Sequence, residues 1–233
     1  MSAVPTQFRP RLEDWLLGAL CPARCLICGE TVQVGVLICP TCQAGLPEEI
    51  IRRTLCLADG RPLEVIAALP YEGGFRQTLL RMKFREERGL AKPVARLSTE
   101  AARAHQVSFS LAAYVCKHKE DWRKHGYDQG QLLAKYLAAE LGIPLGHVLE
   151  KHRRTKRQHE LGGKAREENL VGAYRAVSSL TGKTVLLVDD IVTTGSTLRE
   201  CARALYEAGA QKVCAVCAAS TMPDRKKYVD RKG

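Results

Sequence analysis

The chain has 233 residues, of which 36 are lysine or arginine and 25 are aspartate or glutamate, so its formal net charge is +11. Hydrophobic residues make up 45% of it and charged residues 26%, which excludes wholesale disorder, a collagen helix and a coiled coil. No apolar run approaches the roughly 18–20 residues that span a bilayer, and residues 1–10 lack the apolar centre of a secretion signal. We therefore expect a cytoplasmic protein without membrane insertion, whose positive charge suits nucleic acid or a phosphorylated small molecule.

The first quarter of the chain predicts a short helix followed by a cysteine-rich module. Apolar residues recur at helical spacing up to residue 20, which places an N-terminal helix within residues 1–20. Residues 21–60 contain six of the ten cysteines, many glycines and prolines, and little hydrophobic periodicity. Because a segment of that composition is held by something other than an apolar core, we treat 21–60 as a separate small module.

Beyond residue 61, strands and helices are expected to alternate. This alternation predicts an α/β domain over 61–222, with a mainly parallel sheet and helices on both of its faces. A basic tail, 223–233, follows the domain. The expected strands are 65–69, 111–116, 147–149, 173–177, 184–188 and 212–218, and the expected helices are 75–84, 90–104, 129–141 and 196–208.

Two Cys-x2-Cys pairs stand ten residues apart within the cysteine-rich module. Tetrahedral Zn²⁺ takes four thiolate ligands, and each Cys-x2-Cys turn presents two sulfurs on one side. Four buried free thiols are the alternative, but the module has few other apolar residues with which to bury them. We therefore expect a closed structural zinc site without metal catalysis, and the sequence leaves open whether Cys21 or Cys56 replaces a ligand. The predicted ligands are Cys25, Cys28, Cys39 and Cys42.

Two further cysteines, Cys214 and Cys217, lie within the strand expected at 212–218. They resemble another metal-binding pair in spacing. However, residues three apart on a strand point to opposite faces of a sheet. We therefore expect both to be core residues.

The most informative stretch is 184–205, where an apolar strand ends in Asp189 and Asp190 and a hydroxyl-rich turn leads into a helix. The first turn of a helix has unpaired N–H groups and a positive dipole end, which suit a phosphate. Carboxylates repel phosphate but accept O–H bonds, so the aspartates suit the hydroxyls of a sugar. Together these groups describe a site for ribose with a 5′-phosphate. The expected phosphate-binding residues are Thr193, Thr194, Gly195, Ser196 and Thr197.

Other types of site explain less of this stretch. The chain contains neither GxxxxGK[ST] nor GxGxxG, which excludes a Walker A loop and a dinucleotide-binding fingerprint. A Mg²⁺ site at the aspartate pair would not explain the threonine-rich turn. Helix capping explains one or two of the hydroxyls, but not the whole arrangement at the end of a strand.

Residues 185–198, VLLVDDIVTTGSTL, resemble the signature with which type I phosphoribosyltransferases bind phosphoribosyl pyrophosphate (PRPP). Three further features narrow the resemblance: the four-cysteine module ahead of the domain, a Met-Lys-Phe segment at 82–84, and a TxxQxxL pattern followed by RxxN within 155–169. Together they resemble the ComF family of competence-associated, phosphoribosyltransferase-like proteins, over about residues 25–219.

The resemblance implies a type I phosphoribosyltransferase-like fold and a displacement at the anomeric carbon of PRPP, which binds with Mg²⁺. Asp189, Asp190 and Arg154 would then carry the chemistry. The basic segment 151–166, with seven Lys or Arg against one Glu, would be a flap that closes on the phosphates or a strip that binds nucleic acid. The further PRPP contacts expected are Lys83, Lys117 and Lys119.

The chain departs from the family pattern at two places. Where the family has Val-Pro-x-Pro, residues 114–119 read YVCKHK, in the loop that would hold pyrophosphate. Where it has Arg-Gly-Phe-Asn-Gln, residues 125–129 read HGYDQ. Both changes bear on whether turnover occurs and on which acceptor is used.

Three functions fit these observations. The first is an enzyme that uses Mg²⁺-PRPP and serves the uptake and processing of single-stranded DNA in competence. The second is a non-catalytic protein that keeps the ribose-phosphate pocket and binds DNA or a DNA-processing partner. The third is a regulator that senses PRPP without turnover. The sequence does not distinguish among these three functions, and it does not give the oligomeric state.

Overall fold

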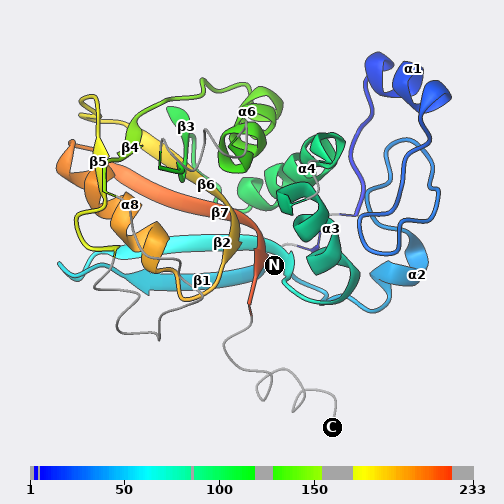
Figure 1. Cartoon of the computed structure of the whole chain (residues 1–233), viewed down its shortest axis with the longest axis horizontal. Helices are drawn as coiled ribbons and strands as arrows, with labels where there is room; N and C mark the ends of the chain where they lie inside the picture. Colours follow the sequence, from blue (N-terminus) through cyan, green and yellow to red (C-terminus); the bar gives the residue numbers. More distant parts are fainter. Residues whose placement is uncertain (1–2, 5, 85–86, 119–127, 154–169, 222–233) are drawn as a thin grey trace, which may run out of the picture.

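The computed structural model describes residues 3–4, 6–84, 87–118, 128–153 and 170–221. Four strands of its central sheet pair in parallel, and the fifth joins one edge antiparallel to its neighbour. A separate antiparallel pair consists of β4 (Leu149–Lys151) and β5 (Tyr174–Ala176). Across the central sheet the order is β1 (Ile51–Cys56), β2 (Pro62–Pro70), β7 (Lys212–Ser220), β6 (Thr184–Val192) and β3 (Leu111–Tyr114) (Figure 1).

Helices cover both faces of this sheet, as predicted. Side chains alternate along each strand, so Leu186 and Val216 pack against the three-helix layer, while Leu187 and Val213 pack on the opposite side. The 3-10 turn η1 (Arg88–Leu90) leads into the middle helix of the first layer. That layer contains α3 (Gly73–Phe84), α4 (Ala91–Arg103) and α6 (Gln129–Leu141), and the other face carries α8 (Ser196–Glu207) (Figure 1).

The cysteine-rich module lies beside α3 and α4 at one end of the molecule (Figure 1). Its Leu26 is buried in the same apolar cluster as residues of those helices. The Thr78 hydroxyl of α3 donates to the Leu26 carbonyl oxygen at 2.7 Å. A Cβ atom at Gly74 would lie 2.0 Å from the Ile27 carbonyl oxygen. The helix layer and the module therefore meet at backbone distance, which requires glycine at this point.

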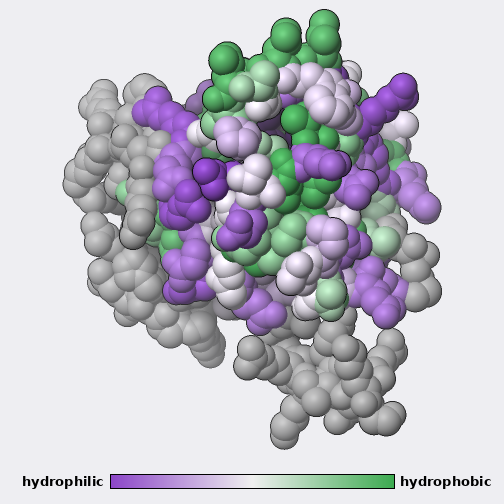
Figure 2. Space-filling model, turned by 90° about the vertical axis from the view of Figure 1, so that its right-hand side faces the viewer, coloured by the Kyte–Doolittle hydropathy of each residue, from purple (hydrophilic) through white to green (hydrophobic). Residues whose placement is uncertain are grey.

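The N-terminal helix α1 (Leu12–Leu20) is attached through charge rather than through its apolar side chains. Its buried Asp14 accepts hydrogen bonds from Arg96 at 2.8 Å and Lys92 at 3.3 Å. Burial opposes ionisation of Asp14, but these partners and the Arg11 N–H lower the pKa of its carboxyl. Figure 2 shows the side of the molecule that lies on the right in Figure 1, and hydrophobic residues gather at its top. The exposed apolar side chains of α1 are Leu12, Trp15, Leu16, Leu17 and Leu20.

The bounds of several strands differ from the sequence prediction, and one strand was not predicted. β2 begins at Pro62, three residues before the expected strand 65–69. β6 was expected to end at residue 188, but its ladder with β7 continues to the Val192–Ser220 pair. β4 begins at Leu149, where the expected strand 147–149 ends. β1 was not expected, and it lies within residues 21–60, the segment predicted as the cysteine-rich module. It nevertheless pairs along its whole length with β2 of the main sheet.

Candidate functional site

A cavity of about 540 Å³ lies at the carboxyl ends of β3 and β6. Parallel pairing of these strands, with Tyr114 opposite Val188, brings the segments that follow them to the same edge of the sheet. The cavity therefore gathers predicted site residues that are far apart in the sequence. Its lining includes Tyr71, Lys83, Lys117, Asp128, Gln129, Lys151, Tyr174, Asp189, Asp190, Thr193, Thr194, Gly195, Ser196 and Thr197.

The aspartate pair lies near the carboxyl end of β6 and is followed in the strand by Ile191 and Val192. The Asp190 carboxylate accepts a hydrogen bond from Lys83 Nζ at 2.9 Å, across 107 positions of sequence. Attraction to Asp190 raises the pKa of Lys83, although burial opposes this. Asp189 Oδ1 accepts the N–H of Asp190 at 2.9 Å. Burial, and then the neighbouring charge of Asp190, raise the pKa of Asp189 well above its usual value, so Asp189 holds its proton more firmly than an exposed aspartate.

The turn between β6 and α8 consists of Thr193, Thr194 and Gly195. Gly195 is the N-cap of α8 and has φ +78°, a conformation that L-residues rarely adopt. Gly195 itself has no side chain that could cap the helix, the Thr194 hydroxyl accepts the Ser196 N–H at 3.4 Å, and the N-terminal end of the helix borders the cavity. The Thr194 and Ser196 hydroxyls are hydrogen-bonded to each other at 2.8 Å. Backbone N–H groups and hydroxyls thus meet where the helix dipole favours an anion.

β1 supports this turn from behind. Arg53 donates to the carbonyl oxygen of Thr193 at 2.7 Å. A Cβ atom on Gly195 would lie 2.3 Å from Leu55 Cδ1, so the turn approaches β1 closely. β1, which the sequence did not predict, therefore supports the turn that was predicted to bind phosphate.

The opposite wall of the cavity is built from the loop after β3 and the start of α6. Asp128 accepts the N–H of Lys117 at 2.9 Å and that of Gly130 at 2.9 Å, which makes it the N-cap of α6. Lys117 Nζ donates to the Gln129 side-chain oxygen. Gln129 Nε2 in turn donates to the Lys83 carbonyl oxygen at 2.9 Å. The departure from the family pattern at Asp128 thus has a structural role, because this acid joins the loop to the helix.

Several predicted site residues lie outside the described residues, and two residues that line the cavity were not predicted. Lys119 and Arg154 belong to the first group, as does the basic segment 151–166 beyond Arg153. Tyr71 and Tyr174 belong to the second, although both line the cavity. Tyr71 follows β2 at the same edge of the sheet, which is a usable sequence signal.

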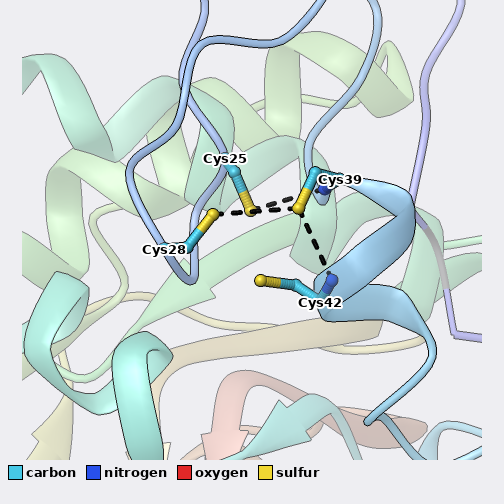
Figure 3. Close-up of side chains that lie close together, drawn as sticks. All are labelled: Cys25, Cys28, Cys39 and Cys42. Carbon is cyan, nitrogen blue, oxygen red and sulfur yellow. Dashed lines mark hydrogen bonds between the residues drawn. The ribbon is translucent and has the colours of Figure 1, made fainter.

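The four predicted zinc ligands come together in one cluster, with their sulfurs directed at a common point (Figure 3). Cys28 and Cys39 bring their sulfurs within 3.7 Å. Burial disfavours a charged thiolate at Cys25, yet backbone N–H donors lower the pKa of that thiol to about 7. Burial and the neighbouring thiols raise the pKa of Cys42 to about 12. Four gathered sulfurs, of which those of Cys25 and Cys39 accept backbone N–H groups, fit a closed tetrahedral Zn²⁺ site.

Two further cysteines, which the sequence left open as possible zinc ligands, are not part of this cluster. Cys21 and Cys56 are both exposed, and neither is among the four gathered sulfurs. Cys214 and Cys217 are fully buried, as predicted. In the described residues, the predicted zinc site therefore consists of the two Cys-x2-Cys pairs alone.

Comparison with known proteins matches both parts of the chain. Residues 128–232 match the family described as phosphoribosyl transferase domain, and residues 16–73 match the double zinc ribbon domain. The first match includes the turn at the start of α8, and the second includes the four-cysteine cluster. In the part of the chain that the structure describes, no helix is both long enough and apolar enough to cross a membrane.

Three curated relatives share this organisation to different extents. DNA utilization protein YhgH of Salmonella typhimurium is 28% identical over 206 residues, and that of Salmonella typhi is 29% identical over 208 residues. Each alignment spans 85% of this chain and 90% of the relative. Competence protein F of Haemophilus influenzae is 32% identical over 143 residues, which span 57% of this chain and 62% of the relative. The chain therefore combines a match to a phosphoribosyl transferase domain with a match to a double zinc ribbon domain, and it is similar to proteins named for competence and DNA utilization.

Proposed function

We propose that the cavity binds the ribose 5-phosphate part of PRPP. The observation that carries this proposal is the meeting of Asp189 and Asp190 with the first turn of α8 in one cavity. The phosphate would accept hydrogen bonds from N–H groups and hydroxyls of residues 193–197, while the ribose hydroxyls would donate to the aspartates. A volume of about 540 Å³ suits a small ligand of this size.

The lysines of the cavity would bind the diphosphate of PRPP. Lys83, Lys117 and Lys151 all line it, so a polyanion would meet three ammonium groups. Lys83 already pairs with Asp190 at 2.9 Å and would hold that carboxylate in place for the sugar. Lys119 and Arg154 would add to these contacts, as the family resemblance implies.

The cavity also fits a Mg²⁺ ion that arrives with the diphosphate, because hard divalent cations prefer carboxylate and phosphate oxygens. Asp128 already accepts three N–H groups and Asp190 is paired with Lys83, so Asp189 is the carboxylate that would meet the ion. A bound Mg²⁺ would offset the charge of the departing diphosphate. The protein's own part is to orient the ribose and to exclude water from the anomeric carbon.

We propose phosphoribosyl transfer as the activity, in the service of uptake and processing of single-stranded DNA. Two observations support the DNA role: the net charge of +11 and the names of relatives in competence and DNA utilization. The segment 151–166 would contact DNA, the phosphates of PRPP, or both. A zinc site made of cysteine thiolates favours the reducing cytoplasm as the location.

A non-catalytic role is the second candidate. It is favoured by the engagement of Lys117 with Gln129 and Asp128, since these contacts occupy groups that would otherwise meet the diphosphate. The protein would then keep the ribose-phosphate pocket while it binds DNA or a DNA-processing partner. A sensor of PRPP without turnover would use the same pocket.

Thermal melting with PRPP and Mg²⁺ tests the proposed pocket. We expect PRPP to raise the melting temperature of the wild type, and the Asp189→Asn/Asp190→Asn variant to lose this shift. Asp59→Asn removes an exposed carboxylate from the β1–β2 loop and should keep the shift. The absence of any shift in the wild type would contradict the proposal.

Two further measurements separate the candidate functions. Release of pyrophosphate with a nucleobase or DNA acceptor would identify an enzyme, while binding without release would identify a sensor. Salt-dependent binding of single-stranded DNA, lost when Arg153, Arg154 and Arg157 are neutralised together, would support the DNA role.

A further inference from the structure

A second group of potential metal ligands lies away from the cavity and from the four-cysteine cluster. Glu64 and Cys214 are direct neighbours across the parallel pair β2–β7, so their side chains share one face of the sheet. His105 reaches the same place from the turn after α4. The ligand atoms of the three side chains all lie within 4.8 Å of one another. The group is near the amino-terminal ends of β2 and β7, at the edge of the sheet opposite the proposed PRPP site.

The hydrogen bond of His105 fixes which ring nitrogen is available. Its Nε2 lies 2.9 Å from the carbonyl oxygen of Ala215. A carbonyl oxygen only accepts, so Nε2 carries the ring proton, and Nδ1 of the neutral ring presents a lone pair. The ring is buried, and this burial lowers the pKa of His105 despite the nearby Glu64 carboxylate. The Nδ1 lone pair is therefore directed toward the other members of the group.

The potential ligand atoms of His105 and Cys214 both lie close to one carboxylate oxygen of Glu64. His105 Nδ1 is 3.7 Å from Glu64 Oε2, and Cys214 Sγ is 3.9 Å from the same oxygen. A cation placed between these atoms would satisfy all three. In a tetrahedral Zn²⁺ site, bonds of about 2.1 Å to N and O and about 2.3 Å to S put the N···O pair about 3.4 Å apart and the S···O pair about 3.6 Å apart. The two distances to the Glu64 oxygen therefore need to close by only a few tenths of an ångström, and the half-exposed Glu64 can make that movement.

The surroundings resemble those of known histidine ligands. A metal-binding histidine almost always donates its second ring nitrogen to a carbonyl or carboxylate, which is the bond that His105 already makes to Ala215. Thiolate, imidazole and carboxylate together form a donor set typical of Zn²⁺. Lys212 Nζ lies 3.7 Å from the same Glu64 oxygen and competes with a metal for it. Because the Lys212 side chain is 43% exposed, it can move into solvent.

We propose that Glu64, His105 and Cys214 bind a second Zn²⁺ ion, separate from the four-cysteine site. Water on the exposed side, beside Glu64, supplies the fourth ligand. Binding releases the thiol proton of Cys214 to solvent, and the ion joins the end of α4 to β2 and β7. The double zinc ribbon match does not account for this site, since His105 and Cys214 lie outside residues 16–73.

The test uses the full chain with its four-cysteine site already filled with Zn²⁺. Titration with Co²⁺, followed by visible absorption, should show one further equivalent bound with cysteine, histidine and oxygen ligands. Cys214→Ala and Glu64→Gln should each abolish this equivalent. Lys212→Gln removes the competing ammonium group and should tighten binding. Cys217→Ala removes an equally buried thiol on the other face of β7 and should leave the second equivalent intact.

Two results would overturn the proposal. One is a wild-type chain that binds no Co²⁺ beyond the four-cysteine site. The other is a second equivalent that survives in Glu64→Gln, a substitution at a half-exposed side chain that leaves the core packing intact even if Cys214→Ala fails to fold.

Discussion

Replacing Gly195 with alanine tests the turn that the proposed function depends on. Gly195 has φ +78°, and an added Cβ atom would lie 2.3 Å from Leu55 Cδ1. A left-handed conformation costs an L-residue about 1–2 kcal/mol, and a methyl group forced into a filled core costs about 1–3 kcal/mol. We therefore expect Gly195→Ala to lower the free energy of unfolding by roughly 2–5 kcal/mol.

Gly182→Ala provides a matched control. Gly182 has a similar φ of +71°, but no atom lies within 4 Å of its added Cβ. Only the conformational cost of about 1–2 kcal/mol should remain, which corresponds to a loss of roughly 2–8 °C in melting temperature for a chain of this size. Adding Leu55→Ala to Gly195→Ala opens the space that the methyl group needs. A double-mutant cycle between these two substitutions isolates the energy of the close contact.

Urea denaturation in zinc-saturated buffer measures these free energies, and thermal melting with PRPP and Mg²⁺ measures ligand binding in the same variants. Gly195→Ala should lose the PRPP shift because the turn must move to admit the methyl group, whereas Gly182→Ala should keep it. The reasoning is refuted if Gly195→Ala is as stable as Gly182→Ala and retains the full PRPP shift.

Three further predictions follow from charged and metal-binding groups. Asp189→Asn should raise the melting temperature at pH 7, because a carboxyl whose pKa is raised on folding destabilises the fold when it is ionised in the unfolded state. This gain should disappear as the pH falls below about 4, where the acid becomes neutral in the unfolded state as well. Asp14→Asn should lower stability by about 1–3 kcal/mol and make α1 more sensitive to protease, because the neutral amide ends the ion pairs of Arg96 and Lys92 with residue 14 of α1. Removal of zinc by a chelator should lower the melting temperature, and more readily at low pH, because the thiols must lose their protons to bind zinc.

Each of these predictions has a clear contrary result. An Asp189→Asn variant that melts below the wild type at pH 7 would contradict the raised pKa of the acid. Unchanged proteolysis of α1 in Asp14→Asn would show that the exposed helix is held by other contacts. A melting curve indifferent to chelation would rule out a structural role for the four-cysteine cluster.

Local signals in the sequence predicted much of the fold. The helix at 129–141 was predicted with its observed bounds, because its apolar residues lie on one face and Gly142 follows it. The structure adds Asp128 as the N-cap and gives Gly142 a left-handed φ of +68°. The strand, turn and helix around Gly195 were predicted for the same reason, since cap residues and apolar runs are local. The two Cys-x2-Cys pairs likewise define their cluster by spacing alone.

Long-range contacts were beyond the sequence pattern. The Lys83–Asp190 pair joins residues 107 positions apart, and only the parallel order of the strands brings them together. The strand β1 is short, its sequence IRRTLC places three polar residues in a row, and it follows a segment rich in cysteine. Its strand identity comes from pairing with β2, in a register that places Ile51 opposite Ala67. The local sequence of β1 does not predict such pairing, because the pairing depends on the position of β2 at the edge of the folded sheet.

That same strand determines how the chain can be divided into independently folding pieces. A shortened chain beginning at residue 61 would lack β1, so one side of β2 would present unpaired backbone groups to solvent and invite edge-to-edge aggregation. It would also lack Arg53 and Leu55, the residues behind the turn before α8. A shortened chain should therefore keep residue 51 and everything after it if the remaining domain is to have an intact binding turn.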